Sequence, residues 1–125
     1  IYPNSDAGGR EMIKVIKEYE DLPHVKTFNN LPRASYVGLL SVASAMVGNS
    51  SSALVDAPNF GLPAVNVGTR QEGRERGGNL IDVGCYREEI RKAICFALES
   101  LDQPDFRAKC QMSPPGLIVK KLSLL

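Results

Sequence analysis

Cysteine and histidine are scarce in this chain of 125 residues. The only histidine, His24, precedes an expected strand, and we assign it no catalytic role. The three cysteines are odd in number and show no Cys-x-x-Cys or Cys/His spacing, so the sequence predicts neither a disulfide framework nor a metal site. We therefore expect reduced thiols in a cytoplasmic protein that uses no cofactor.

A strong net charge and a long apolar run are also missing. The formal net charge is +1, and the few aromatic residues do not alternate with basic ones, which disfavours a role in binding nucleic acid. No run of about 18 apolar residues and no signal-peptide pattern occurs, so we expect no membrane contact. Because the chain begins with Ile1 rather than Met, we expect it to be a piece of a longer protein.

The composition, 43% apolar and 23% charged, is typical of one globular domain, which we expect to span residues 1–125. Strands and helices are predicted to alternate, which favours an α/β fold with a mainly parallel sheet and right-handed crossovers. The expected strands are residues 1–3, 25–28, 45–47, 64–67 and a short one at 80–83. The expected helices are residues 10–20, a segment through Tyr36 and Ala43, one that begins at serines 50–52 and has Asp56 about two turns along it, residues 87–101, and two C-terminal ones from Pro104 and from Leu117.

A serine cluster follows the buried strand predicted at residues 45–47. That strand ends at Gly48, and Asn49 and serines 50–52 then stand where a helix should begin. Such residues satisfy free backbone N–H groups at a helix start, so a plain helix cap is one interpretation. The other is a phosphate site, because open parallel sheets bind ligands at the carboxyl ends of their strands, where free N–H groups favour an anion.

A loop rich in glycine and arginine, residues 68–79, follows the next predicted strand and should end at the same edge of the sheet. Guanidinium groups bind phosphate oxygens in pairs, which makes Arg70 a candidate partner of an anion at the serines. A run of charges in a loop is usually only solvated, and this is our expectation for Arg74, Glu75 and Arg76.

These two loops carry a resemblance. The run GNSSSALVDAPNFGLPAVNVGTRQEGRERGGNLI resembles the carboxyl-terminal, nucleotide-binding domain of UDP-N-acetylglucosamine 2-epimerases. It is most similar to the hydrolysing branch, which has Gly-Asn-Ser-Ser at this place where the non-hydrolysing branch has Asp-Ser-Gly-Gly. The match is dense over residues 45–83, looser over residues 1–9, and departs from the family near the C-terminus.

The resemblance implies a Rossmann-like three-layer domain that forms one half of a glycosyltransferase-B-like two-domain architecture. The implied enzyme eliminates UDP from UDP-N-acetylglucosamine and adds water to the 2-acetamidoglucal, which gives N-acetylmannosamine for sialic-acid-type sugars. Its acid and base carboxylates would lie in the N-terminal half, which is absent here. No catalytic residue is therefore expected in this chain, and the isolated chain should be inactive.

The resemblance also assigns binding residues for UDP or UDP-N-acetylglucosamine. They are Ser50, Ser51 and Arg70 for the diphosphate, Asp56 for the ribose, backbone groups of Phe28 and Asn29 for the uracil, and Asn4 near the sugar nucleotide. The family has Glu at the place of Asp56. The implied partners are the missing N-terminal domain and, as an open question, a second copy of the chain.

Three other interpretations remain. A glycosyltransferase half-domain would share the UDP site but would not be expected to contain the Gly-Thr-Arg-Gln-x-Gly-Arg run. A non-hydrolysing UDP-N-acetylglucosamine 2-epimerase would differ at the serine cluster. A flavodoxin-like receiver module would need clustered acidic residues at the end of the first strand, where this sequence has serines and arginines instead.

Overall fold

The computed structural model describes residues 1–3 and 7–102. Contacts divide the chain into two compact units, an N-terminal unit, Ile1–Gly38, and a sheet unit, Leu39–Leu125. Helix α2, Arg33–Val42, crosses this division. The single domain expected over residues 1–125 stays a prediction, and the helices expected from Pro104 and Leu117 lie outside the described residues.

The N-terminal unit contains helix α1, Gly9–Tyr19, close to the predicted bounds. The strands predicted at residues 1–3 and 25–28 are wrong as regular strands, although the Tyr2 N–H donates to the Phe28 carbonyl at 2.9 Å. Pro3 has no N–H to extend this pairing, and two short extended segments by themselves form only a marginal ladder. One backbone hydrogen bond therefore joins these segments, and the described residues of this unit form no sheet.

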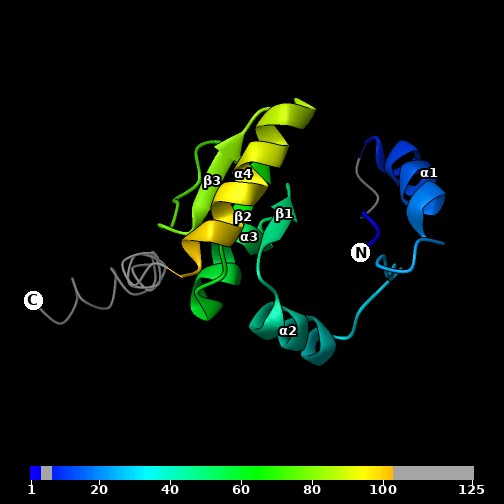
Figure 1. Cartoon of the computed structure of the whole chain (residues 1–125), viewed down its shortest axis with the longest axis horizontal. Coiled ribbons are helices and arrows are strands. Elements are labelled where there is room, and N and C mark those ends of the chain that lie inside the picture. The colour runs from blue at the N-terminus through cyan, green and yellow to red at the C-terminus, as the bar shows by residue number, and fades with distance from the viewer. Residues whose placement is uncertain (4–6, 103–125) are drawn as a thin grey trace, which may run out of the picture. The chain divides into compact units, whose positions relative to one another are not determined.

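The sheet unit is built on three parallel strands in the order β1-β2-β3 (Figure 1). They are β1, Met46–Gly48, β2, Ala64–Val67, and β3, Leu80–Val83. Gly48 lies opposite Asn66, and Val67 lies opposite Val83. The carboxyl ends of all three strands therefore meet at one edge of the sheet, as predicted.

Both faces of this sheet are covered. Helix α4, Arg87–Ser100, packs through Ala93 and Ala97 onto Val65, and these small side chains allow a close approach. Side chains alternate along a strand, so Ala64 and Asn66 face the other side, and all three of these β2 residues are buried. The short helix α3, Ser52–Val55, contacts β1 and β2, and a 3-10 turn, η1, Ala57–Phe60, follows it. This layered arrangement confirms the Rossmann-like α/β class.

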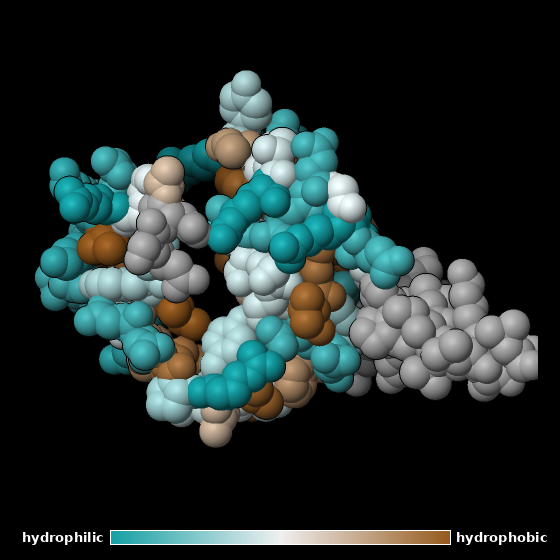
Figure 2. Space-filling view, turned by 180° about the vertical axis from the view of Figure 1, so that it is seen from behind, coloured by the Kyte–Doolittle hydropathy of each residue, from teal (hydrophilic) through white to brown (hydrophobic). Residues whose placement is uncertain are grey.

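The surface is mixed in polarity. Figure 2 shows the apolar residues on one face as small brown groups separated by teal polar ones. In α1 the apolar side chains of Met12, Val15 and Tyr19 are about half exposed. Among the described residues, no helix combines the length and the apolar character that a membrane span requires.

Candidate functional site

The serine turn, residues 49–51, connects β1 to α3. Gly48 has φ 152°, a conformation that favours glycine and directs the chain out of the strand. The Ser50 side chain accepts the Ser52 N–H at 3.2 Å, and the Ser51 carbonyl accepts the N–H groups of Leu54 and Val55. Within residues 1–3 and 7–102, the backbone N–H groups of Ser50 and Ser51 have no hydrogen-bond acceptor. The turn thus presents two adjacent donors at the carboxyl edge of the sheet.

The helix after the serine turn is shorter than expected. Our sequence interpretation placed Asp56 about two turns into a continuous helix, but α3 contains four residues and Asp56 is its C-cap. The reason is Pro58, which has no N–H to donate to the Leu54 carbonyl, so the chain changes to the 3-10 turn η1. Because α3 is only one helical turn long, its dipole is weak. An anion at this place would therefore be attracted mainly by the N–H groups of the serine turn itself.

Asp56 is hydrogen-bonded to Ser52, the residue that follows the serine turn. Its carboxylate is half-buried and accepts a hydrogen bond from the Ser52 hydroxyl at 2.5 Å. The side chain is therefore oriented by the first residue of α3. Its role toward a ribose stays a prediction.

The arginine loop, residues 68–79, is joined to the serine turn by a residue that the sequence analysis did not select. Gln71 is only 3% exposed, although most of its neighbours in the loop lie in solvent. Its Nε2 donates to the Asn49 carbonyl at 2.8 Å. This contact brings together the loops that carry Ser50 and the exposed Arg70. The only sequence signal for Gln71 was its place in the Arg-Gln-x-Gly-Arg run.

Arg76 is exposed, as expected, but it also forms an ion pair that the sequence analysis did not predict. Its guanidinium pairs with the Asp82 carboxylate and also donates to the Gln71 carbonyl at 3.3 Å. Asp82 accepts a further hydrogen bond from Asn66 Nδ2 at 2.7 Å. The arginine loop is thereby tied to β2 and β3 as well as to the serine turn. Arg74 and Glu75 are exposed, as expected.

Asn79 closes the arginine loop. It is fully buried, and its Nδ2 donates to the carbonyls of Ala53 and Leu62, both at 3.1 Å. One side chain therefore links the end of this loop to α3 and to the segment that leads into β2. The bridge therefore attaches α3, the helix that follows the serine turn, to the end of the arginine loop.

A family model described as UDP-N-acetylglucosamine 2-epimerase matches residues 1–113, which is most of the chain and includes both loops. The chain belongs to the UDP-N-acetylglucosamine 2-epimerase family. The resemblance noted from the sequence is confirmed at this level.

Curated relatives of this chain agree with the family. It is 40% identical over 107 residues to the UDP-N,N'-diacetylbacillosamine 2-epimerase (hydrolyzing) of Legionella pneumophila, covering 86% of this chain and 28% of that protein. It is 38% identical over 106 residues to the GDP/UDP-N,N'-diacetylbacillosamine 2-epimerase (hydrolyzing) of Campylobacter jejuni. That match covers 83% of this chain and 26% of the Campylobacter protein. A UDP-N-acetylglucosamine 2-epimerase of Neisseria meningitidis is 34% identical over 94 residues, a match that covers 75% of this chain and 25% of that protein. The chain thus spans about a quarter of the length of these relatives.

The remaining predicted contacts of this epimerase chain belong to the N-terminal unit. Phe28 and Asn29 are both exposed, and the Phe28 carbonyl is already used by the Tyr2 N–H. A carbonyl oxygen can accept a second hydrogen bond, so the uracil assignment stays a prediction. Asn4 lies outside the described residues.

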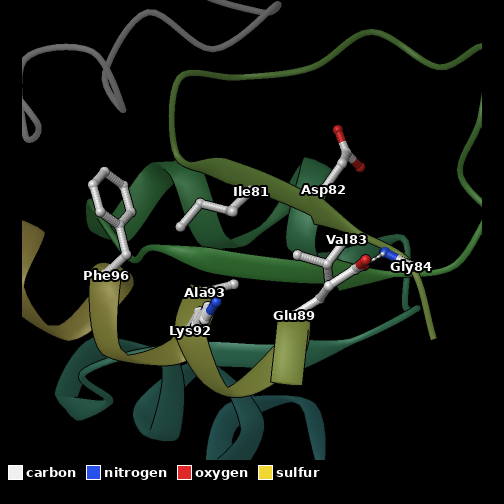
Figure 3. Close-up of a pocket in the computed structure, with 8 residues that line it drawn as sticks. All are labelled: Ile81, Asp82, Val83, Gly84, Glu89, Lys92, Ala93 and Phe96. Carbon is white, nitrogen blue, oxygen red and sulfur yellow. Dashed lines mark hydrogen bonds between the residues drawn. The ribbon is translucent and has the colours of Figure 1, made fainter. Parts of the chain in front are cut away.

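A shallow hollow between β3 and α4 is a separate feature. Figure 3 shows Ile81, Val83, Ala93 and Phe96 around it, with Glu89 accepting the Gly84 N–H at 3.0 Å. Asp82 points away from Ile81 and Val83, toward the side where Asn66 and Arg76 bind it. The hollow is mainly apolar and does not include the serine turn. Among residues 1–3 and 7–102, no group of acidic, histidine or cysteine side chains could hold a metal ion.

Proposed function

We propose that this chain supplies the UDP-binding part of a hydrolysing UDP-sugar 2-epimerase. The supporting observation is the serine turn, whose two adjacent N–H groups lie at the carboxyl edge of a parallel sheet and whose Asn49 carbonyl is hydrogen-bonded to the arginine loop. Free N–H groups suit a diphosphate, and a guanidinium from the adjoining arginine loop would suit it as well. In this proposal Ser50, Ser51 and Arg70 bind the diphosphate.

The reaction gives these groups a chemical role. Elimination of UDP breaks the bond between the anomeric carbon and the diphosphate oxygen, and both bonding electrons leave with the diphosphate. Donors that are already aimed at that oxygen stabilise the charge that develops in the transition state. The Ser50 and Ser51 N–H groups and Arg70 have this task. Protons at the sugar are moved by carboxylates of the remainder of the enzyme.

The nucleoside is held by groups outside the serine turn. Asp56 accepts hydrogen bonds from the ribose hydroxyls, and backbone groups of Phe28 and Asn29 bind the uracil. The Ser52 hydroxyl orients the Asp56 carboxylate for this contact, which compensates in part for a side chain one methylene shorter than the family's Glu. Asn4 contributes near the sugar.

The hydrolysing outcome is supported by the Gly-Asn-Ser-Ser sequence of the turn and by the names of two relatives. UDP-N-acetylglucosamine is our first candidate substrate, with N-acetylmannosamine as the product. The higher identities belong to proteins named for UDP-N,N'-diacetylbacillosamine, which makes that nucleotide sugar the second candidate. Assays of the longer protein that contains this chain, with each nucleotide sugar in turn, distinguish the two by the free sugar released.

Titration of UDP into the 125-residue chain by calorimetry tests the proposal. We expect binding with a dissociation constant of about 10 µM to 1 mM, because a few hydrogen bonds and one cation act without closure over the sugar. Arg70→Ala should weaken UDP about tenfold. The control is Arg74→Ala, which removes an equal charge from an exposed site of the same loop and should change the affinity less than twofold. Equal losses in both variants would show that only the net charge of the loop matters.

A further inference from the structure

Gln71 is an unusual residue for its position. It is 97% buried, yet its Oε1 has no hydrogen-bond partner among the described residues. A buried acceptor without a donor is destabilising and offsets part of what the Nε2 hydrogen bond of the same amide contributes. The other amide atom, Nε2, makes a contact that an apolar side chain could not make.

The Nε2 of Gln71 determines how one peptide of the serine turn is oriented. It donates to the Asn49 carbonyl at 2.8 Å across 22 residues of sequence. The Asn49–Ser50 peptide is trans and planar, so its carbonyl and the Ser50 N–H point in opposite directions. A carbonyl that is held toward the buried Gln71 therefore directs the Ser50 N–H away from it.

The backbone of Gln71 is itself held in place. Its carbonyl accepts hydrogen bonds from the Arg76 guanidinium and from the Arg74 N–H, both at 3.3 Å. Arg76 is in turn paired with Asp82 on β3. The backbone of the residue that holds the serine turn is thus connected to β3 through Arg76.

We propose that Gln71 is a positioning residue, which holds the Asn49–Ser50 peptide so that the Ser50 N–H stays directed at the diphosphate of a bound UDP-sugar. This inference rests on the proposed function, since it assumes that UDP binds at the serine turn. Gln71 does not touch the ligand. It acts through Ser50.

The test compares UDP with uridine, which has the same base and ribose but no phosphate, in NMR titrations of the chain. Gln71→Met keeps the length and most of the volume of the side chain but cannot donate to the Asn49 carbonyl. We expect it to weaken UDP about tenfold and to leave uridine within twofold. The free Ser50 N–H signal should also shift. The melting temperature should change by less than about 5 °C, because loss of the hydrogen bond and removal of the unpaired Oε1 offset each other.

The control is Asn59→Ala, which also removes a hydrogen bond from a side-chain amide to a backbone carbonyl. In this case Asn59 Nδ2 donates to the Val55 carbonyl at 3.2 Å, and its loss should leave UDP binding unchanged. Gln71→Asn is the second variant, since its amide is too short to reach Asn49 and it should reproduce the loss of UDP affinity. Equal UDP binding by wild type and both Gln71 variants would overturn the positioning role while the proposed function stood. Equal weakening of UDP and uridine would also overturn it. If the wild-type chain bound no UDP, the proposed function would fail first.

Discussion

Asn79 should be the most stabilising polar side chain of the sheet unit. The informative change is Asn79→Asp, which keeps the shape of the side chain and replaces the donor Nδ2 by a carboxylate oxygen. That oxygen would face the carbonyls of Ala53 and Leu62, each now at 3.1 Å from Nδ2, in a site with no solvent exposure. Two hydrogen bonds would be replaced by two repulsive contacts.

The magnitude follows from these contacts. Each lost hydrogen bond removes about 1 kcal/mol of stability. A buried charge that has no compensating partner costs about 3–5 kcal/mol more. We expect Asn79→Asp to lower the free energy of unfolding by about 5–7 kcal/mol, because it loses both hydrogen bonds and buries an unpartnered charge. Asn79→Ala, which loses the same bonds without adding charge, should lower it by about 2–3 kcal/mol. Even the smaller loss is a large part of the stability of a small domain.

Urea unfolding followed by far-UV circular dichroism measures these losses, and amide exchange at Val65 assigns them to the sheet unit. The control is Asn59→Asp, the same change at an exposed asparagine that donates to Val55, which should cost about 0.5 kcal/mol or less. If Asn79→Asp unfolded at the same urea concentration as Asn59→Asp, the two buried hydrogen bonds would not support the fold as argued.

Three further changes test the site. Ser51→Glu should abolish UDP binding with little change in melting temperature, because a carboxylate beside the free N–H groups competes with the diphosphate; calorimetry that shows unchanged affinity would leave the serines as a helix cap. Asp56→Asn should weaken UDP binding several-fold and leave pyrophosphate binding unchanged, whereas Arg70→Ala should weaken the binding of both ligands. An Asp56→Asn variant with normal UDP affinity would remove the ribose assignment. Arg76→Ala should cost about 1 kcal/mol or less in urea unfolding, since its ion pair with Asp82 is partly exposed, and a loss of several kcal/mol would mean that the pair is far stronger than its exposure allows.

The elements that local patterns predicted well are those with continuous apolar runs or clear periodicity. The strands at Met46–Gly48, Ala64–Val67 and Leu80–Val83 were each predicted within one residue, because short apolar runs between turn residues indicate buried parallel strands. Helix α4 was predicted from its amphipathic spacing. The segment at residues 25–28 contains the β-favouring residues Val25, Thr27 and Phe28, but strand formation needs a ladder partner, and one hydrogen bond from Tyr2 does not make a ladder.

The contacts within the site were less accessible to sequence reasoning. The effect of Pro58 on α3 was available from local rules and was overlooked. The burial of Gln71 and the pairing of Arg76 depend on partners that the fold brings close, Asn49 and Asp82, and no local periodicity reveals them. The serine and arginine residues were found because strand ends concentrate binding groups, whereas the residues that orient them were not.

The most direct test of the account is an NMR titration of the 125-residue chain with UDP, in which the backbone N–H signals of Ser50 and Ser51 are followed. We expect saturable shifts that are largest at these two residues, with a dissociation constant of about 10 µM to 1 mM. Shifts that are absent at UDP concentrations of about 5 mM, well above that range, or that occur only at residues away from the serine turn and Arg70, would contradict the claim that this chain holds UDP.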